Sequence, residues 1–85
     1  MMKISELQEI LVKENIDVNE YALNSKFVRG EAGLTIRKEA DKYIVAVCER
    51  NEERILKEST CEHAATKVFL EYMSESYENL KQYLK

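Results

Sequence analysis

The chain has 85 residues, 13 basic and 16 acidic side chains, a net charge of −3 and 45% hydrophobic residues. This length supports one modest core, so we expect residues 1–85 to form a single domain. The hydrophobic content excludes a disordered chain, and the acidic balance disfavours a nucleic-acid-binding protein. The N-terminus lacks a signal-peptide core, and no window approaches the ~18 apolar residues of a membrane span. We expect a cytoplasmic protein without membrane association.

The first predicted element is a helix over residues 5–15. Ser5 and Gln8 have the spacing of a capping box, in which each side chain bonds to the other residue's backbone amide. Apolar residues at helical spacing predict a buried face made by Leu7, Ile10 and Leu11. Asn15 is a typical terminator, because asparagine tolerates the left-handed backbone that ends many helices.

A second start signal follows, with Asp17 in a capping position and Glu20 three residues later. Few apolar residues come after it, so we expect only one short helical turn over residues 17–23. Lys26–Ala32 is predicted to be a loop. The two glycines of the chain are expected where a side chain would force an unfavourable backbone angle; they are Gly30 and Gly33.

Three strands are predicted next. Residues 34–38 alternate apolar and polar, residues 43–48 are nearly continuously apolar, and residues 54–58 follow a charged tip. The short connections between them predict an antiparallel meander.

A closing helix is predicted from Thr60, after a capping box at Ser59–Glu62. Its pattern weakens at Ser74–Ser76 and resumes to the end of the chain. The helix either breaks there or overhangs the domain. The predicted fold is therefore an α+β, α-β-β-β-α two-layer sandwich with a three-stranded antiparallel meander and a long or broken C-terminal helix.

The charged hairpin tip, residues 48–54, is the most conspicuous candidate surface. We find no catalytic constellation, metal-ligand pattern or phosphate loop, so we expect no enzyme, metal or cofactor. His63 is the only histidine, and Cys61 points about 200° away from it on a helix. We predict a protein that acts by binding, through Glu49, Arg50, Glu52, Glu53 and Arg54, with weaker candidates at Asp41, Asp17 and Glu20.

Two other functions have some support. An overhanging stripe of Tyr77, Leu80 and Leu84 would dock on a second copy, giving a homodimeric adaptor through residues 74–85. The α-β-β-β-α order is also that of double-stranded-RNA-binding domains. However, Glu62 and His63 stand where those domains carry a lysine cluster, so nucleic-acid binding is disfavoured.

Four segments in order resemble the immunity protein 59 family of bacterial polymorphic-toxin systems. They are the opening helix Ile4–Leu11, the segment Tyr21–Asn24, the pair Glu49-Arg50 that ends a strand, and a closing helix with Glu62, Ala64-Ala65 and Phe69-Leu70. The resemblance covers roughly residues 4–73. Asn51 stands where that family tends to have glycine.

The resemblance implies a stoichiometric inhibitor of a cognate toxin C-terminal domain in a contact-dependent or polymorphic toxin system. Such a protein binds the toxin inside the producing cell and blocks its active site or substrate groove. If the toxin is a nuclease, acidic side chains of the inhibitor would occupy the phosphate path and speed association.

Overall fold

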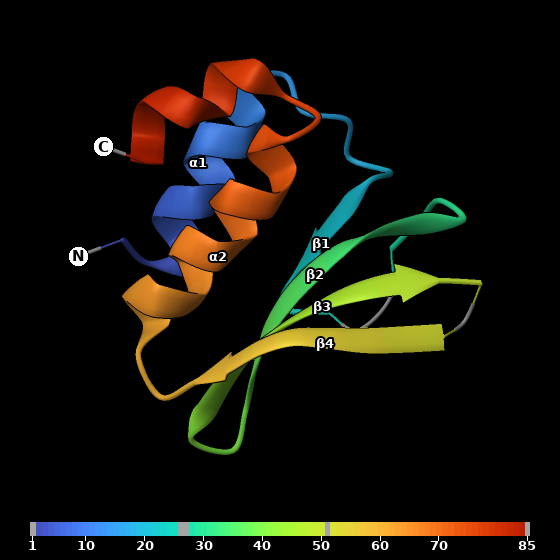
Figure 1. The fold of residues 1–85 in the computed structure, drawn as a ribbon, viewed down its shortest axis with the longest axis vertical. Helices are drawn as coiled ribbons and strands as arrows, with labels where there is room; N and C mark the ends of the chain where they lie inside the picture. Colours follow the sequence, from blue (N-terminus) through green and yellow to red (C-terminus); the bar gives the residue numbers. More distant parts are fainter. Residues whose placement is uncertain (1, 26–27, 51, 85) are drawn as a thin grey trace.

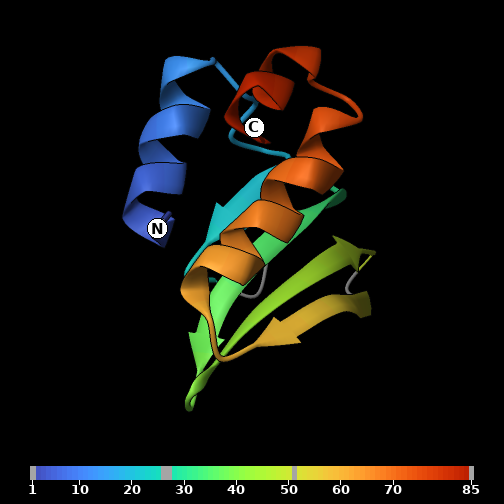
Figure 2. The same cartoon turned by 60° about the vertical axis from the view of Figure 1, so that its left-hand side comes forward.

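The computed structural model describes residues 2–25, 28–50 and 52–84. In chain order the elements are α1 (Ile4–Lys13), β1 (Tyr21–Leu23), β2 (Ala32–Glu39), β3 (Lys42–Glu49), β4 (Glu52–Ser59), α2 (Glu62–Ser74) and the 3₁₀ helix η1 (Glu78–Leu84). Helix α2 lies across one face of the sheet and α1 lies beside α2, as Figures 1 and 2 show. The predicted α+β class is therefore confirmed.

The sheet has four strands in the order β1-β2-β3-β4, one more than the sequence predicted. Its antiparallel part, β2-β3-β4, is the predicted meander. Each of these three strands has eight residues, whereas five or six were predicted. Asn51, which the sequence places in the last turn of the meander, lies outside the described residues.

The prediction of a helical turn over residues 17–23 is wrong. Asp17 does form a turn, because its carboxylate accepts a hydrogen bond of 2.9 Å from the Asn19 amide. A strand follows that turn instead of a helix. Strand β1 runs parallel to β2, with Tyr21 opposite Leu34. Asp17 therefore signals a turn, which aspartate favours whatever element follows. Pairing with the distant strand β2 makes the following element a strand.

Gly30 and Gly33 are required by close backbone contacts and not by unusual backbone angles. The prediction that each occupies an unfavourable backbone angle is therefore wrong. Neither glycine has a positive φ. A Cβ at Gly33 would lie 2.4 Å from the Glu20 carbonyl oxygen and 2.8 Å from Cγ1 of Val28. A Cβ at Gly30 would lie 2.7 Å from the Asn19 carbonyl oxygen. The missing side chains let the segment before β1 lie directly against the start of β2.

Neither predicted capping box forms. Ser5 lies inside α1, which begins at Ile4. The Ile4 amide instead donates a hydrogen bond of 2.8 Å to the carboxylate of Glu62, at the start of α2. In front of α2, the Ser59 hydroxyl accepts from the Cys61 amide at 3.0 Å, and no side chain caps the helix itself. The acidic residue predicted to cap its own helix therefore caps the neighbouring one.

Helix α1 ends at Lys13, two residues earlier than predicted, and Asn15 acts as the expected terminator just beyond the C-cap Glu14, with a φ of 58°. The Asn15 amide donates to the Val12 carbonyl at 3.1 Å, and the Ile16 amide donates to the Leu11 carbonyl at 3.0 Å. These two bonds are the Schellman motif. Leu11 and Ile16 are both buried, so the motif also ties the end of the helix to the core.

The closing helix breaks where the sequence pattern weakened, because α2 ends at Ser74 and η1 folds back beside it. Leu80 of η1 is fully buried. The Tyr83 hydroxyl donates to one Glu14 carboxylate oxygen, and the Asn79 side-chain amide donates to the other, each at 2.8 Å. The apolar stripe of the tail thus packs within its own chain and does not overhang.

The main core lies between the helices and the sheet. Its fully buried members come from α1, β2, β3, α2 and η1 and include Leu7, Leu11, Leu34, Ile36, Val45, Ala65, Phe69, Leu70 and Leu80. Within the described residues, no helix is long and apolar enough to cross a lipid bilayer.

Candidate protein-binding surface

The β3–β4 hairpin holds two carboxylates opposite each other. Glu49 is the last residue of β3 and pairs with Glu52, the first residue of β4. Val45 and Val47 pack against the core beneath α2, and side chains alternate along a strand, so Glu49 points to the same face. Directly opposite residues of antiparallel strands share a face. Both carboxylates therefore project on the side of α2.

No ion pair with a described residue compensates this like-charge pair. Like charges directly opposite each other destabilise a sheet. In the described part of the chain, the ion pairs all involve Arg37, and neither Glu49 nor Glu52 takes part in one. Arg54 lies on the same face, opposite Val47, but makes no ion pair with a described residue. Both carboxylates are therefore without a direct ion-pair partner among the described residues.

Glu53 differs from its neighbours because it lies on the opposite face, across from Cys48. Its carboxylate binds Arg37 at 2.9 Å, and Arg37 also binds Glu39 at 2.9 Å. The Arg37 side chain is only 12% exposed. Burial acts to lower the pKa of Arg37, but the hydrogen bonds to Glu53 and Glu39 outweigh it and raise that pKa. Glu53 is thus engaged within the fold.

Arg50 occupies the hairpin turn itself. Its φ is 49°, in the left-handed region that non-glycine residues seldom adopt. Its amide donates a hydrogen bond of 3.1 Å to the Glu31 carbonyl, which ties the turn to the segment before β2. The side chain of this exposed residue is therefore presented from a fixed backbone position.

A groove beside the hairpin separates the C-terminal half of α2 from the sheet. Its inner part is a cavity of about 340 Å³ lined by Glu20, Ala32, Gly33, Leu34, Val47, Glu49, Tyr72, Met73, Ser76 and Tyr77. Its outer part is a shallower hollow lined by Leu56, Val68, Glu71, Tyr72 and Glu75. Tyr72 belongs to both parts, so we call the whole the Tyr72 groove.

The Tyr72 groove combines an apolar floor with an acidic rim. Leu34, Val47 and Met73 form the floor of the inner part, while Glu20 and Glu49 supply its carboxylates. Two further carboxylates border the outer part, and no lysine or arginine is among the described residues that line either part. Four carboxylates therefore line the groove, and Arg54 lies beside it on the same face, opposite Val47.

Glu20 is held in place by Tyr77, whose hydroxyl donates a hydrogen bond to its carboxylate. This hydrogen bond, together with partial burial, raises the pKa of Tyr77 and so favours the neutral phenol that donates it. Asp17 lies close enough to influence the same phenol. The structure thus brings Glu20 and Glu49 to one cavity, with Asp17 beside it.

Asp41 lies apart from the other predicted binding residues. It follows β2 at the turn to β3, where Glu39 pairs with Lys42. Glu49 lies at the far end of the eight-residue β3, which spans roughly 23 Å at ~3.3 Å per residue. A single small interface at the hairpin therefore does not reach Asp41.

The sequence analysis missed the contribution of α2 to this surface. Tyr72 of α2 is 38% exposed. Val68 and Tyr72 are four residues apart and lie one position before the buried pair Phe69 and Met73. Val68 packs against the core while Tyr72 is exposed, and the sequence pattern of a wide apolar stripe does not separate the two.

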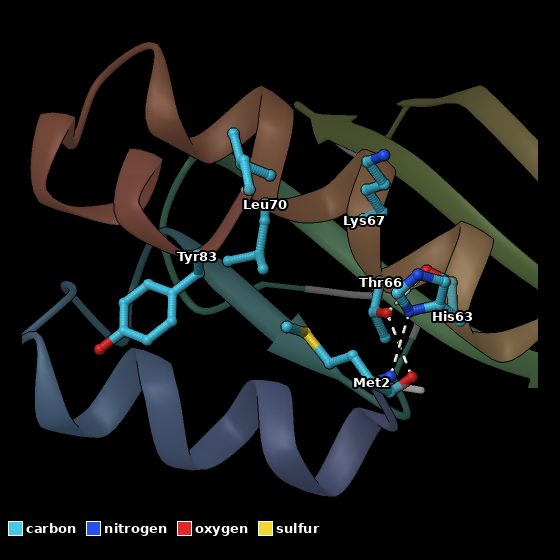
Figure 3. A pocket seen from close by; sticks show the side chains of 7 residues that line it. Met2, His63, Thr66, Lys67, Leu70 and Tyr83 are labelled. Carbon is cyan, nitrogen blue, oxygen red and sulfur yellow. Dashed lines mark hydrogen bonds between the residues drawn. The ribbon is translucent and has the colours of Figure 1, made fainter.

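A second cavity, of about 110 Å³, lies among α1, α2 and η1 and is drawn in Figure 3. Nδ1 of His63 accepts a hydrogen bond of 3.1 Å from the Met2 amide, and the Thr66 hydroxyl donates to the His63 carbonyl at 2.9 Å. Small-molecule sites usually enclose ~300–1,000 Å³, so this cavity is a packing gap between elements. No cluster of three or more metal-ligating side chains occurs among the residues described.

No protein-family model matches the chain, and neither a curated protein nor a solved structure is significantly similar to it.

Proposed function

We propose that this chain is an immunity protein that binds and neutralises a cognate bacterial toxin domain by stoichiometric protein–protein binding in the cytoplasm. The proposal combines the resemblance to the immunity protein 59 family with one structural observation. That observation is the Tyr72 groove, whose apolar floor is bordered by four carboxylates and by no lysine or arginine among its described lining residues. Such a surface is suited to a basic protein partner.

The hairpin extends the proposed interface beyond the groove. Glu49 and Glu52 lie on the face of α2 without an ion pair to a described residue, and Arg50 projects from the adjoining turn. Interface hot spots are typically aromatic or arginine side chains within a ring of polar contacts. Tyr72 is the exposed aromatic residue at the centre of this surface, so we assign it the role of anchor.

A nuclease is the kind of toxin that fits this surface best. Enzymes that cleave nucleic acids need basic side chains along the phosphate path. An inhibitor with clustered carboxylates competes for those side chains and is steered to them by long-range attraction. Its effect needs no catalysis and no cofactor.

The homodimeric adaptor has lost its main support, because Leu80 is buried within the chain and η1 packs beside α2. The residues at the start of α2 give no support to RNA binding either. The Glu62 carboxylate there is occupied by the Ile4 amide, and the ring of His63 is bonded to Met2. Neither arrangement creates the lysine clamp that duplex RNA requires.

The proposal is tested by capturing partners with the tagged protein in the native bacterium and identifying them by mass spectrometry. The captured candidate domain is then expressed alone and with this chain in a susceptible host. Growth arrest that is relieved by co-expression, together with a 1:1 complex on gel filtration, is the expected result. A non-toxic partner, or toxicity that co-expression leaves unchanged, would refute the immunity function.

A further inference from the structure

We propose that the inner cavity of the Tyr72 groove is a receptor for one guanidinium group, supplied by an arginine side chain of the partner. The inference deepens the proposed function and rests on it for the identity of the partner. The receptor itself is a property of this chain, so it is testable without the toxin. Three independent features of the cavity support it.

The first feature is charge. Glu20, just before β1, and Glu49, at the end of β3, both line the cavity, and Glu52 faces Glu49 across the hairpin. A cation bound there would replace a repulsive pair of carboxylates by attractive contacts. Glu49 has no hydrogen bond or ion pair with another described residue, so both of its oxygens are available as acceptors.

The second feature is shape and surface. The cavity of about 340 Å³ is large enough for one long side chain and lies at the lower limit for a small-molecule ligand. Two tyrosine rings, Tyr72 and Tyr77, line it beside the methionine Met73. A planar guanidinium stacks on aromatic rings and forms forked hydrogen bonds to carboxylates, whereas a lysine ammonium acts as a point charge.

The third feature is preorganisation. The Tyr77 hydroxyl holds the Glu20 carboxylate before any partner arrives. Gly33 brings the sheet backbone against the Glu20 carbonyl, which fixes the other side of the same residue. Fixed acceptors lose little freedom on binding, so more of the interaction energy contributes to affinity.

The test is a titration of the isotope-labelled protein with Nα-acetyl-argininamide, followed by amide chemical shifts. The neutral isostere Nα-acetyl-citrullinamide and the ammonium analogue Nα-acetyl-lysinamide serve as matched probes. We expect saturable shifts at Gly33, Glu49 and Tyr72 with the arginine probe. We expect the citrulline probe to bind roughly tenfold more weakly than the arginine probe, a difference that corresponds to about 1.4 kcal/mol. We also expect the lysine probe to bind more weakly than the arginine probe.

Two variants control for general electrostatic attraction. Glu49→Gln removes a carboxylate of the cavity, and Glu58→Gln removes an exposed carboxylate of β4 outside it. We expect only Glu49→Gln to weaken binding of the arginine probe. Absent or non-saturable shifts, equal binding of citrulline, equal or tighter binding of lysine, or equal effects of both variants would overturn the proposal. None of these results bears on whether the chain neutralises a toxin, which the co-expression experiment decides.

Discussion

The carboxylate of Glu62, the first residue of α2, accepts a hydrogen bond of 2.8 Å from the amide of Ile4, the first residue of α1. The first amides of a helix have no partner within that helix, so this contact caps α1 from outside. It also joins two elements that are 58 residues apart in the sequence. One side chain therefore fixes where α1 begins and how it lies against α2.

We predict that Glu62→Ala lowers the free energy of unfolding by about 1 kcal/mol, the usual cost of losing a helix N-cap. Glu62→Gln keeps an acceptor oxygen and should lose less. Urea unfolding measures both, with Glu58→Ala as the control for an exposed carboxylate of similar sequence position. Equal stabilities of the Glu62→Ala and Glu58→Ala proteins would contradict the capping role.

The tail should be essential for folding. Leu80 is fully buried, so Leu80→Ala should cost about 2–5 kcal/mol, as other buried leucines do. Val12→Ala is the matched control, because Val12 is 62% exposed and its substitution should change stability by less than about 0.5 kcal/mol. Chemical denaturation provides both values.

A truncation after Met73 distinguishes this role from assembly. Removal of η1 would uncover the core, so we expect the shortened chain to be unfolded by circular dichroism. A shortened chain that is folded and monomeric, derived from a dimeric full-length protein, would instead make the tail an assembly element.

Tail docking should weaken at alkaline pH. Hydrogen bonds to Glu20 and Glu14 raise the pKa values of Tyr77 and Tyr83 above the ordinary value of about 10. A raised tyrosine pKa means that the folded state favours the neutral phenol. The stabilisation is therefore complete below pH ~10 and is lost as pH rises through the raised pKa.

The pKa of Glu14 is shifted in the opposite direction to those of the two tyrosines. Hydrogen bonds from Asn79 and Tyr83 lower the pKa of Glu14, so its contribution is present above pH ~4.5 and is lost as pH falls through the lowered pKa. The stabilities of the wild type and Tyr83→Phe should therefore differ most at neutral pH. They should converge as pH rises through the raised pKa of Tyr83 and as it falls through the lowered pKa of Glu14. A difference that stays constant across this range would show that ionisation of Tyr83 does not matter.

The pair of Glu49 and Glu52 in the hairpin should lower the stability of the free protein and strengthen its binding to a basic partner. Glu52→Lys places opposite charges across the strands and should stabilise the free protein by about 0.2–1 kcal/mol. It also adds a cation beside the groove and should weaken binding to a basic partner. Glu58→Lys on the same strand is the control, and equal stability changes in both variants would contradict repulsion at the hairpin.

Much of the fold was predictable because its signals are local. The period of the apolar residues gave α1, the three long strands and the break after α2. The Schellman end at Asn15 also follows from the residue itself. Strand β1 was missed because its three residues show no useful period, and its pairing with Leu34–Ile36 is a non-local choice.

The candidate site was predictable only in part. Charge on a short turn marked Glu49 and Glu52, but strand alternation alone could not show that Glu53 binds Arg37 on the other face. The proximity of Glu20 to Glu49 depends on the parallel pairing of β1, which the sequence analysis did not contain. Long-range pairings therefore decide which charges share a surface.

The most direct measurement of the central claim compares the partners captured by the wild type with those captured by the double variant Glu20→Gln/Glu49→Gln. We predict that the wild type captures a toxin with a basic C-terminal domain. The amount of toxin recovered with the variant should be lower by roughly tenfold or more. Capture of only the chain itself or of ribonucleoprotein, or equal recovery of the toxin by both proteins, would contradict the account.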